Sequence, residues 1–366
     1  MANTSVLNVL RSMRNVTHAM ATTEVNIFDT SHAVDKIISP ILYFFGFPGN
    51  IISIILWMQP RMRHSSGTYL TALGFTDLLF LVIHVLFELH KIWGVYTFDV
   101  PVLCEGLPVL FMATQYLSPL LVLGFTVERF ICVRWPSQRD RLCTSSRAKI
   151  VSLCLAGFAL LLASMQAYFY KFNKVNQTCE MRKSIQTGGH ASLWSIWTWI
   201  TEMLVFLCVP VLILVCNILI IRLVRRYTEF ESSCKERALT TTFSLLLVSF
   251  YFIITTLPVS IVYAMRYTFV PLDGDAFTDH KALARYLLAK SIIEEIGMTH
   301  YACKFYLFLV AERPFREELM RLCMRIKVSA LSSQNGYRFQ TSDNTAHTDW
   351  IEVSQVEASK PEETNM

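Results

Sequence analysis

Residues 191–223 read ASLWSIWTWITEMLVFLCVPVLILVCNILIIRL. Only two side chains in this stretch are charged, those of Glu202 and Arg222. Because about 20 apolar residues in a helix span the hydrocarbon core of a bilayer, the stretch is long enough to cross a membrane. A transmembrane strand would instead alternate apolar and polar residues over about ten positions. The stretch therefore predicts a membrane-spanning helix.

Further apolar runs give seven candidate spans, at about 37–58, 68–90, 103–133, 148–170, 191–223, 238–267 and 284–310. The last run is the least apolar, because it contains Lys290, Glu294, Glu295, His300 and Lys304. Hydrophobic residues make up 53% of the chain and charged residues 17%, against about a quarter in soluble domains. This composition excludes a soluble fold, a disordered chain and a secreted disulfide scaffold. We predict an all-α membrane protein with a seven-transmembrane-helix bundle.

Several other functions are disfavoured by what the sequence lacks. It has no His-Glu-x-x-His, Gly-x-Ser-x-Gly or paired catalytic Asp motif, so we do not expect an enzyme. Its nine histidines show no metal-ligand spacing, and we expect neither a metal nor a cofactor. The net charge of +5 is explained by basic loops of a membrane protein and does not indicate a nucleic-acid partner. A polytopic transporter remains the weaker alternative, because no internal repeat relates the spans.

Loops on the two sides of the predicted bundle differ in composition. Glycosylation sequons begin at Asn3, Asn15 and Asn176, all on one side. Arginine and lysine are denser in the loops of the other side, which the positive-inside rule makes cytoplasmic. We expect a multi-pass plasma-membrane protein with its N-terminus outside and its C-terminus inside.

This orientation divides the chain into four parts. Residues 1–36 are polar, show no evident removable signal peptide and would form an extracellular glycosylated segment. Residues 37–310 would form the transmembrane domain. Residues 311–327 are predicted to be a juxtamembrane amphipathic helix, and residues 328–366 a disordered cytoplasmic tail rich in Ser, Thr and acids.

Two of the ten cysteines lie on the predicted outer face. Cys104 begins the third span and Cys179 lies in the loop after the fourth, so a disulfide between them would hold that loop over the bundle. The other eight are expected to be reduced packing residues, apart from Cys323. Cys323 ends the amphipathic stretch, where palmitoylation would attach the helix to membrane lipid.

A series of short motifs follows the order of a known family over residues 37–326. They are Gly49-Asn50, Leu73 with Asp77, Cys104, Glu128-Arg129-Phe130, Pro210, Pro258 and Phe315-Arg316. Together they resemble the rhodopsin-like (class A) G protein-coupled receptors. Residues 125–136 (FTVERFICVRWP) with Leu142-Cys143-Thr144 also resemble invertebrate neuropeptide receptors of the FMRFamide and myosuppressin type.

The resemblance implies a ligand cavity in the outer half of the bundle. Its lining would include Glu88, Phe111, Gln115, Glu202, Tyr263 and Glu294. Phe111 stands where amine receptors carry an Asp, and acids among aromatics suit a cationic, amidated neuropeptide. A lipid or other small molecule is the alternative ligand. Glu88 and Glu294 have a second interpretation, in which they only pair along their helices with Lys91 and Lys290.

The resemblance also implies partners inside the cell. Arg129, paired at rest with Glu128, would be released when the sixth helix moves outward around Pro258 to admit a heterotrimeric G protein. Phosphorylation of the tail would recruit an arrestin-like protein.

Two departures from the family pattern concern activation. The sixth span reads Thr255-Thr256-Leu257-Pro258 and lacks the usual Trp, and the seventh has Lys304-Phe305 where Asn-Pro is usual. Relatives hold a sodium ion near the positions of Asp77, Ser118 and Lys304. We expect a Lys304–Asp77 salt bridge in place of that ion, or, alternatively, a Lys304 side chain that extends to the cytoplasmic water layer.

Overall fold

The computed structural model describes residues 30–31, 33–97, 99–175, 177–186, 192–228, 235–269 and 280–335. The chain divides into two compact units, Met1–Leu319 and Met320–Met366. The helical bundle belongs to the first unit, and the second begins inside the last helix. The predicted glycosylation sites Asn3, Asn15 and Asn176 and most of the predicted tail lie outside the described residues.

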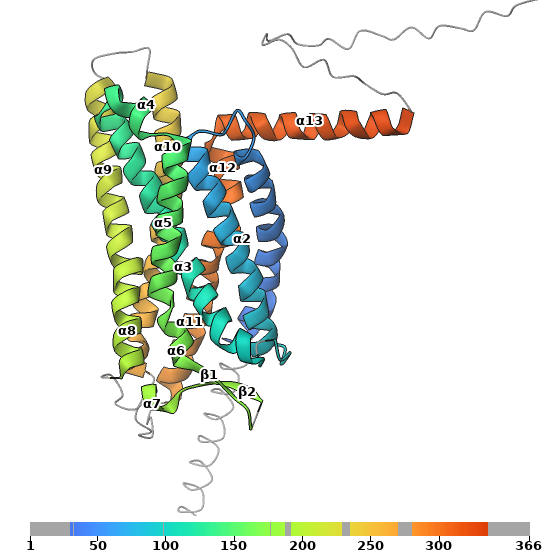
Figure 1. The fold of residues 1–366 in the computed structure, drawn as a ribbon, viewed down its shortest axis with the longest axis vertical. Coiled ribbons are helices and arrows are strands. Elements are labelled where there is room, and N and C mark those ends of the chain that lie inside the picture. The colour runs from blue at the N-terminus through green and yellow to red at the C-terminus, as the bar shows by residue number, and fades with distance from the viewer. Residues whose placement is uncertain are drawn as a thin grey trace, which may run out of the picture. The chain divides into compact units, whose positions relative to one another are not determined.

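Long helices lie side by side in the first unit (Figure 1). In chain order they are the first helix (Ala33–Trp57), α2 (Ser65–Lys91), α3 (Pro101–Arg134), α5 (Ser145–Ala163) with α6 (Met165–Phe169), α8 (Leu193–Glu202) with α9 (Val209–Thr228), α10 (Lys235–Phe269), and α11 (His280–Ala302) with α12 (Lys304–Ala311). Short helices η1 (Pro136–Gln138), α4 (Arg139–Leu142) and α7 (Lys183–Gln186) lie in the connections. The seven predicted spans therefore all coincide with helices.

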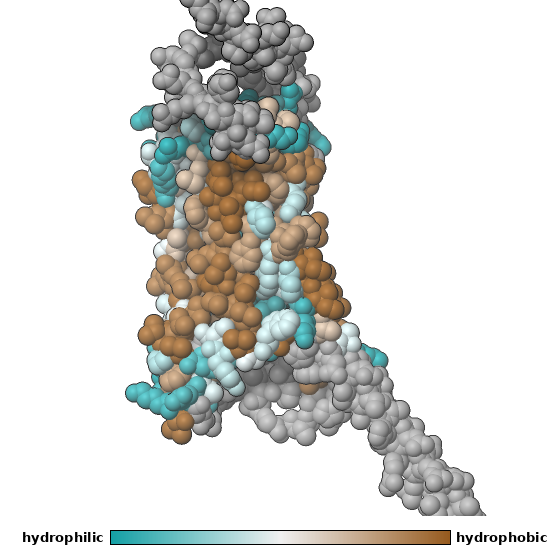
Figure 2. All heavy atoms as spheres, turned by 90° about the vertical axis from the view of Figure 1, so that its right-hand side faces the viewer, coloured by the Kyte–Doolittle hydropathy of each residue, from teal (hydrophilic) through white to brown (hydrophobic). Residues whose placement is uncertain are grey.

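Six of these spans are long and apolar enough to cross a membrane. The seventh, made of α11 and α12, does not reach that apolarity because it carries the charged residues noted above. Large apolar side chains point outward along the helices, among them Phe44, Leu153 and Ile254. Figure 2 shows apolar residues covering the middle of one face, with hydrophilic residues toward its ends. This pattern is expected where lipid is the solvent.

Two of the spans are not continuous α-helices. In the fifth, a π-helical segment, Met203–Cys208, joins α8 to α9 just before Pro210, whose nitrogen has no hydrogen to donate to the preceding turn. In the seventh, the helix is interrupted at Cys303, between Ala302 and Lys304. Asn50 joins the first helix to α11 next to this interruption. Its Nδ2 donates to the carbonyl oxygens of Gly46 at 3.0 Å and Tyr301 at 2.9 Å.

The all-α prediction has one small exception. Strands β1 (Tyr170–Asn173) and β2 (Thr178–Met181) form an antiparallel hairpin in the loop after the fourth span. Cys179 of β2 forms the predicted disulfide with Cys104 at the start of α3. The backbone N–H of Cys179 also donates to Asp99 at 2.7 Å. The hairpin is thereby held at one end of the bundle.

The structure corrects the prediction that the remaining cysteines are reduced. Cys132 and Cys143 form a second disulfide at the opposite end of α3. The last turns of α3 and the short α4 bring their Cα atoms to 6.7 Å, a proximity that a spacing of 11 residues does not reveal. Among the described residues, five cysteines are free thiols, and Cys323 is one of them.

Helix α13 (Arg313–Asn335) continues past residue 327, where the sequence placed the end of the amphipathic helix. Within the first unit its beginning is anchored by Phe315, whose side chain is fully buried. The Phe315 ring lies 5.3 Å from Trp57 and 5.8 Å from Phe308, between ring centroids. Aromatic packing thus attaches the start of α13 to the first helix and α12.

Candidate functional site

A cavity of about 570 Å³ lies between the helices at the end of the bundle that carries the β hairpin. Tyr170 of β1 is part of its lining. All six residues predicted for the ligand cavity also line it: Glu88, Phe111, Gln115, Glu202, Tyr263 and Glu294. They come from α2, α3, α8, α10 and α11, so the cavity is built from most of the bundle.

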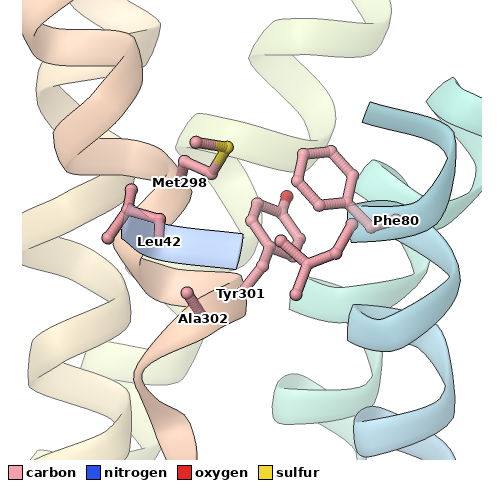
Figure 3. Close-up of a cluster of buried hydrophobic side chains, with 6 residues drawn as sticks. Leu42, Phe80, Met298, Tyr301 and Ala302 are labelled. Atoms are coloured by element: carbon pink, nitrogen blue, oxygen red, sulfur yellow. The ribbon is translucent and has the colours of Figure 1, made fainter. Parts of the chain in front are cut away.

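Aromatic side chains form one wall of the cavity. Phe80 of α2 stacks on Tyr301 of α11, with ring centroids 3.8 Å apart, and on Phe111 of α3 at 5.4 Å. Phe87 lies 4.9 Å from Phe111 on the same side. Phe80 and Tyr301 belong to a buried cluster with Leu42, Leu81, Met298 and Ala302 (Figure 3). The wall is therefore continuous with the core between the first helix, α2 and α11.

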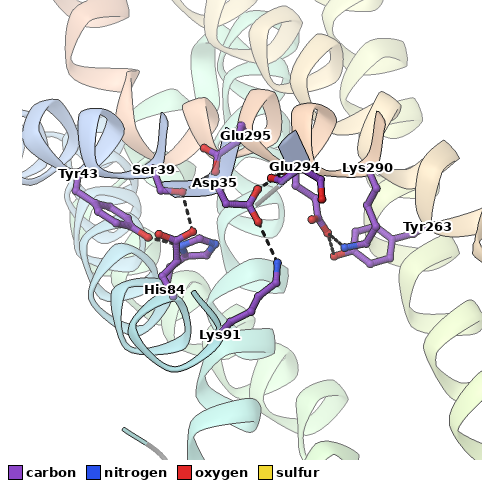
Figure 4. Close-up of polar contacts among 12 residues, drawn as sticks. Asp35, Ser39, Tyr43, His84, Lys91, Tyr263, Lys290, Glu294 and Glu295 are labelled. Atoms are coloured by element: carbon purple, nitrogen blue, oxygen red, sulfur yellow. Dashed lines mark hydrogen bonds and ion pairs between the residues drawn. The ribbon is translucent and has the colours of Figure 1, made fainter. Parts of the chain in front are cut away.

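Charged side chains from the first helix, α2 and α11 gather at another part of the lining (Figure 4). Lys91 Nζ lies 3.0 Å from Asp35 Oδ2, and Lys290 Nζ lies 2.7 Å from Glu294 Oε1. Tyr263 donates a 2.6 Å hydrogen bond to the same Glu294 oxygen. The predicted local pair of Glu294 with Lys290 is therefore present. Lys91 pairs with Asp35 and not with Glu88.

Glu88 and Glu295 are connected through one hydroxyl group. Ser39 Oγ lies 2.8 Å from Glu88 Oε1 and 2.5 Å from Glu295 Oε1. Sequence reasoning did not include Asp35 or Glu295, which line the cavity, and did not single out Ser39. Asp35 and Glu295 are charges within or beside apolar runs, a signal that marks functional positions, but only the fold brings the first helix next to α11.

Deeper in the bundle, Lys304 and Asp77 form a buried ion pair. Lys304 Nζ lies 2.7 Å from Asp77 Oδ2 and 2.9 Å from Asp77 Oδ1, and it donates to Ser118 Oγ at 2.9 Å. The Lys304 side chain is only 2% exposed, which does not fit the alternative in which it reaches a water layer. Ser118 also lies 3.3 Å from His300 Nε2, which completes a network of α2, α3, α11 and α12.

Tyr301 connects the cavity to this ion pair. Its ring is part of the aromatic wall and stacks on Phe80. Lys304 Nζ lies 5.6 Å from the centroid of the same ring. A ligand that displaces Phe80 or Tyr301 would therefore change the surroundings of the buried charges.

Glu128 and Arg129 lie near the opposite end of α3, and the structure corrects their predicted resting pair. Glu128 Oε2 accepts a 2.6 Å hydrogen bond from Ser65, while Arg129 donates to Ser66. No salt bridge joins the two residues, both of which the structure describes. Adjacent residues of a helix point about 100° apart, so each meets a different serine at the start of α2.

Comparison with known proteins defines the class of protein. The sequence pattern of the 7 transmembrane receptor (rhodopsin family) matches residues 49–300, which is more than half of the chain. The chain therefore belongs to the rhodopsin family of seven-transmembrane receptors. It is a multi-pass membrane protein, and its family consists of ligand-activated receptors that couple to G proteins, not of enzymes.

Individual relatives are receptors for diverse ligands. The FMRFamide receptor of Drosophila melanogaster is 31% identical over 123 residues, which cover 31% of this chain and 22% of that receptor. Proteinase-activated receptor 1 of Papio hamadryas is 26% identical over 257 residues, 68% of this chain and 57% of the relative. C-C chemokine receptor type 1 of Homo sapiens is 24% identical over 292 residues, 78% of each chain. The chain thus spans 22% and 57% of the length of the first two relatives.

Proposed function

We propose that this protein is a plasma-membrane receptor for an extracellular, amidated and cationic neuropeptide, with its N-terminus outside the cell. The observation that carries the proposal is the composition of the cavity. Five acids line it (Asp35, Glu88, Glu202, Glu294 and Glu295) against two lysines (Lys91 and Lys290), next to the aromatic wall. Opposite charge and aromatic rings favour a cationic ligand that has apolar side chains.

The same proposal assigns a route from the ligand to a heterotrimeric G protein. The cavity is bordered by α10 at Thr256, Val259 and Tyr263, on both sides of Pro258. Tyr251, five residues before Thr256 on α10, donates to Thr299 of α11 at 2.7 Å. A ligand that shifts α10 against α11 would move the end of α10 that is remote from the cavity outward. This movement would expose Arg129. Two packings of the bundle with different affinity for a G protein are what such signalling requires.

Two further partners belong to the proposal. An arrestin-like protein would bind the phosphorylated tail, where added negative charge forms the recognition element. Cys323 on α13 is exposed and suits palmitoylation, which would bind this helix to membrane lipid.

A ligand screen tests the proposal. Cells that express the full chain are challenged with amidated neuropeptides, including Phe-Met-Arg-Phe-amide, and in parallel with lipids and amines. Calcium and cyclic AMP are measured. We expect responses to cationic amidated peptides, which Arg129→Ala abolishes while surface expression persists. A response confined to lipids would favour the alternative ligand class. An N-terminal epitope that antibodies reach only after permeabilisation would refute the orientation.

A further inference from the structure

The acids at one side of the cavity are not equally neutralised. Asp35 is paired with Lys91 and Glu294 with Lys290, each within 3.0 Å. Glu88 and Glu295 form no salt bridge with any Lys, Arg or His of the described chain. Both residues are buried, with 8% and 6% of their surface exposed. Neither carboxyl group is therefore neutralised by direct contact with a cation, although Lys91, which is paired with Asp35, attracts Glu88 at longer range.

Hydrogen-bond donors compensate for this only in part. The Ser39 hydroxyl has one hydrogen, so it can donate to Glu88 or to Glu295 but not to both at once. Glu295 Oε2 is buried and has no hydrogen-bond partner. Tyr43 lies within hydrogen-bond reach of Glu88, while its hydroxyl oxygen also lies 2.6 Å from His84 Nδ1, so no further donor is left for Glu295 Oε2. Buried carboxylates of this kind require a positive charge or a shared proton.

We propose that Glu88, Ser39 and Glu295 form a subsite that binds a guanidinium group of the ligand, between the first helix, α2 and α11. The proposal rests on the peptide-receptor function above and locates the cationic part of that peptide. Glu88 and Glu295 both line the cavity, so a ligand can supply the missing charge from inside it. In the absence of a ligand, protonation of one of the two carboxyl groups would remove the uncompensated charge.

A guanidinium fits this arrangement better than other cations. It is planar and carries five N–H donors, so it can bond two carboxylates and leave a donor for Glu295 Oε2. Calcium requires six to eight oxygen ligands, which the two carboxylates and one hydroxyl fall short of providing. The aromatic wall of Phe80, Phe87 and Phe111 lines the same cavity and offers an apolar surface to a neighbouring aromatic side chain of the ligand.

The experiment compares two peptides that differ only in charge. Phe-Met-Arg-Phe-amide and its citrulline analogue, in which a neutral urea replaces the guanidinium, are assayed for binding to the purified full-length receptor. We expect the arginine peptide to bind about tenfold or more tightly to the wild type, as is usual for a buried charge-assisted bond. Glu295→Gln should reduce this preference to near unity, and Ser39→Ala should weaken it. Glu105→Gln, an exposed acid outside the cavity, should preserve it.

A second measurement separates this subsite from the choice of peptide. Arginine amide and citrulline amide are added at millimolar concentration, and the thermal stability of wild type and Glu295→Gln is measured. Stabilisation by arginine amide that Glu295→Gln removes supports the subsite even if neither peptide activates the receptor. Equal binding of both peptides to the wild type overturns the subsite while leaving a peptide receptor intact. Absence of stabilisation together with absence of peptide binding overturns it as well.

Discussion

Lys304 supplies a positive charge beside the buried Asp77. Its ammonium nitrogen is surrounded by both oxygens of Asp77 and by Ser118, all within 2.9 Å. A sodium ion next to Asp77 would have to displace this group or share the carboxylate with a second positive charge. Both are unfavourable in a buried site, where repulsion between like charges is strong.

We therefore expect the receptor to be insensitive to sodium. Replacing sodium chloride by choline chloride at constant ionic strength should leave both the melting temperature of the purified protein and its affinity for agonist peptide unchanged. Titrations with the two salts check this. A sodium-specific shift in either quantity would mean that the Lys304–Asp77 pair opens to admit the ion.

The same pair should dominate the stability of the centre of the bundle. Lys304→Met leaves Asp77 buried without its cation, and loss of one partner of a buried pair typically costs about 3–5 kcal/mol. The double variant Asp77→Asn with Lys304→Met removes both charges and should be more stable than Lys304→Met alone. Thermal denaturation in detergent compares them. Equal melting temperatures for Lys304→Met and the wild type would contradict the ion pair.

At the scale of the helices, close contacts between backbone segments limit which side chains fit. Glycines lie at the closest of these contacts. A Cβ atom added at Gly67 in the first turn of α2 would lie 2.1 Å from the carbonyl oxygen of Met62. That oxygen belongs to the backbone and cannot rotate away. By contrast, a Cβ added at Gly157 of α5 would meet no atom within 4 Å.

Alanine at these two positions should consequently have opposite effects. Gly67→Ala should displace the turn between the first helix and α2 and lower the melting temperature and the yield of folded receptor. Gly157→Ala should be neutral or stabilise by up to about 1 kcal/mol, because alanine favours a helix. Expression and thermal denaturation of both variants test this. Similar behaviour of the two would show that the turn before α2 adapts freely.

Over the whole molecule, the Cys104–Cys179 disulfide joins segments separated by 75 residues and fixes the hairpin beside the cavity. In the chain-entropy account, a loop of this size contributes about 4 kcal/mol to stability. We expect Cys104→Ser, Cys179→Ser and the double variant to lose similar stability and peptide affinity, because each breaks the same bond. Cys154→Ser, at an exposed free thiol, should change stability by less than about 0.5 kcal/mol. Additive losses in the double variant would argue for separate roles of the two residues.

The sequence alone determined the membrane class, the seven spans and the family, because apolar run length and the order of Asp77, Cys104, Glu128-Arg129 and Pro258 are local features. It also indicated the six cavity residues, all of which line the cavity in the structure, since family motifs fix their depth in each helix.

The sequence predicted the Lys304–Asp77 and Lys290–Glu294 pairs and the Cys104–Cys179 disulfide, but several other side-chain pairings were decided only by the tertiary structure. The order of residues does not show that Ser39 hydrogen-bonds to Glu295, or that Lys91 forms its salt bridge with Asp35 and not with Glu88. It also does not show that Glu128 and Arg129 hydrogen-bond to two different serines. It likewise did not show that Cys132 meets Cys143. Such contacts depend on how helices rotate and approach one another, and a buried charge or thiol pairs with whatever group the packing brings within about 3 Å.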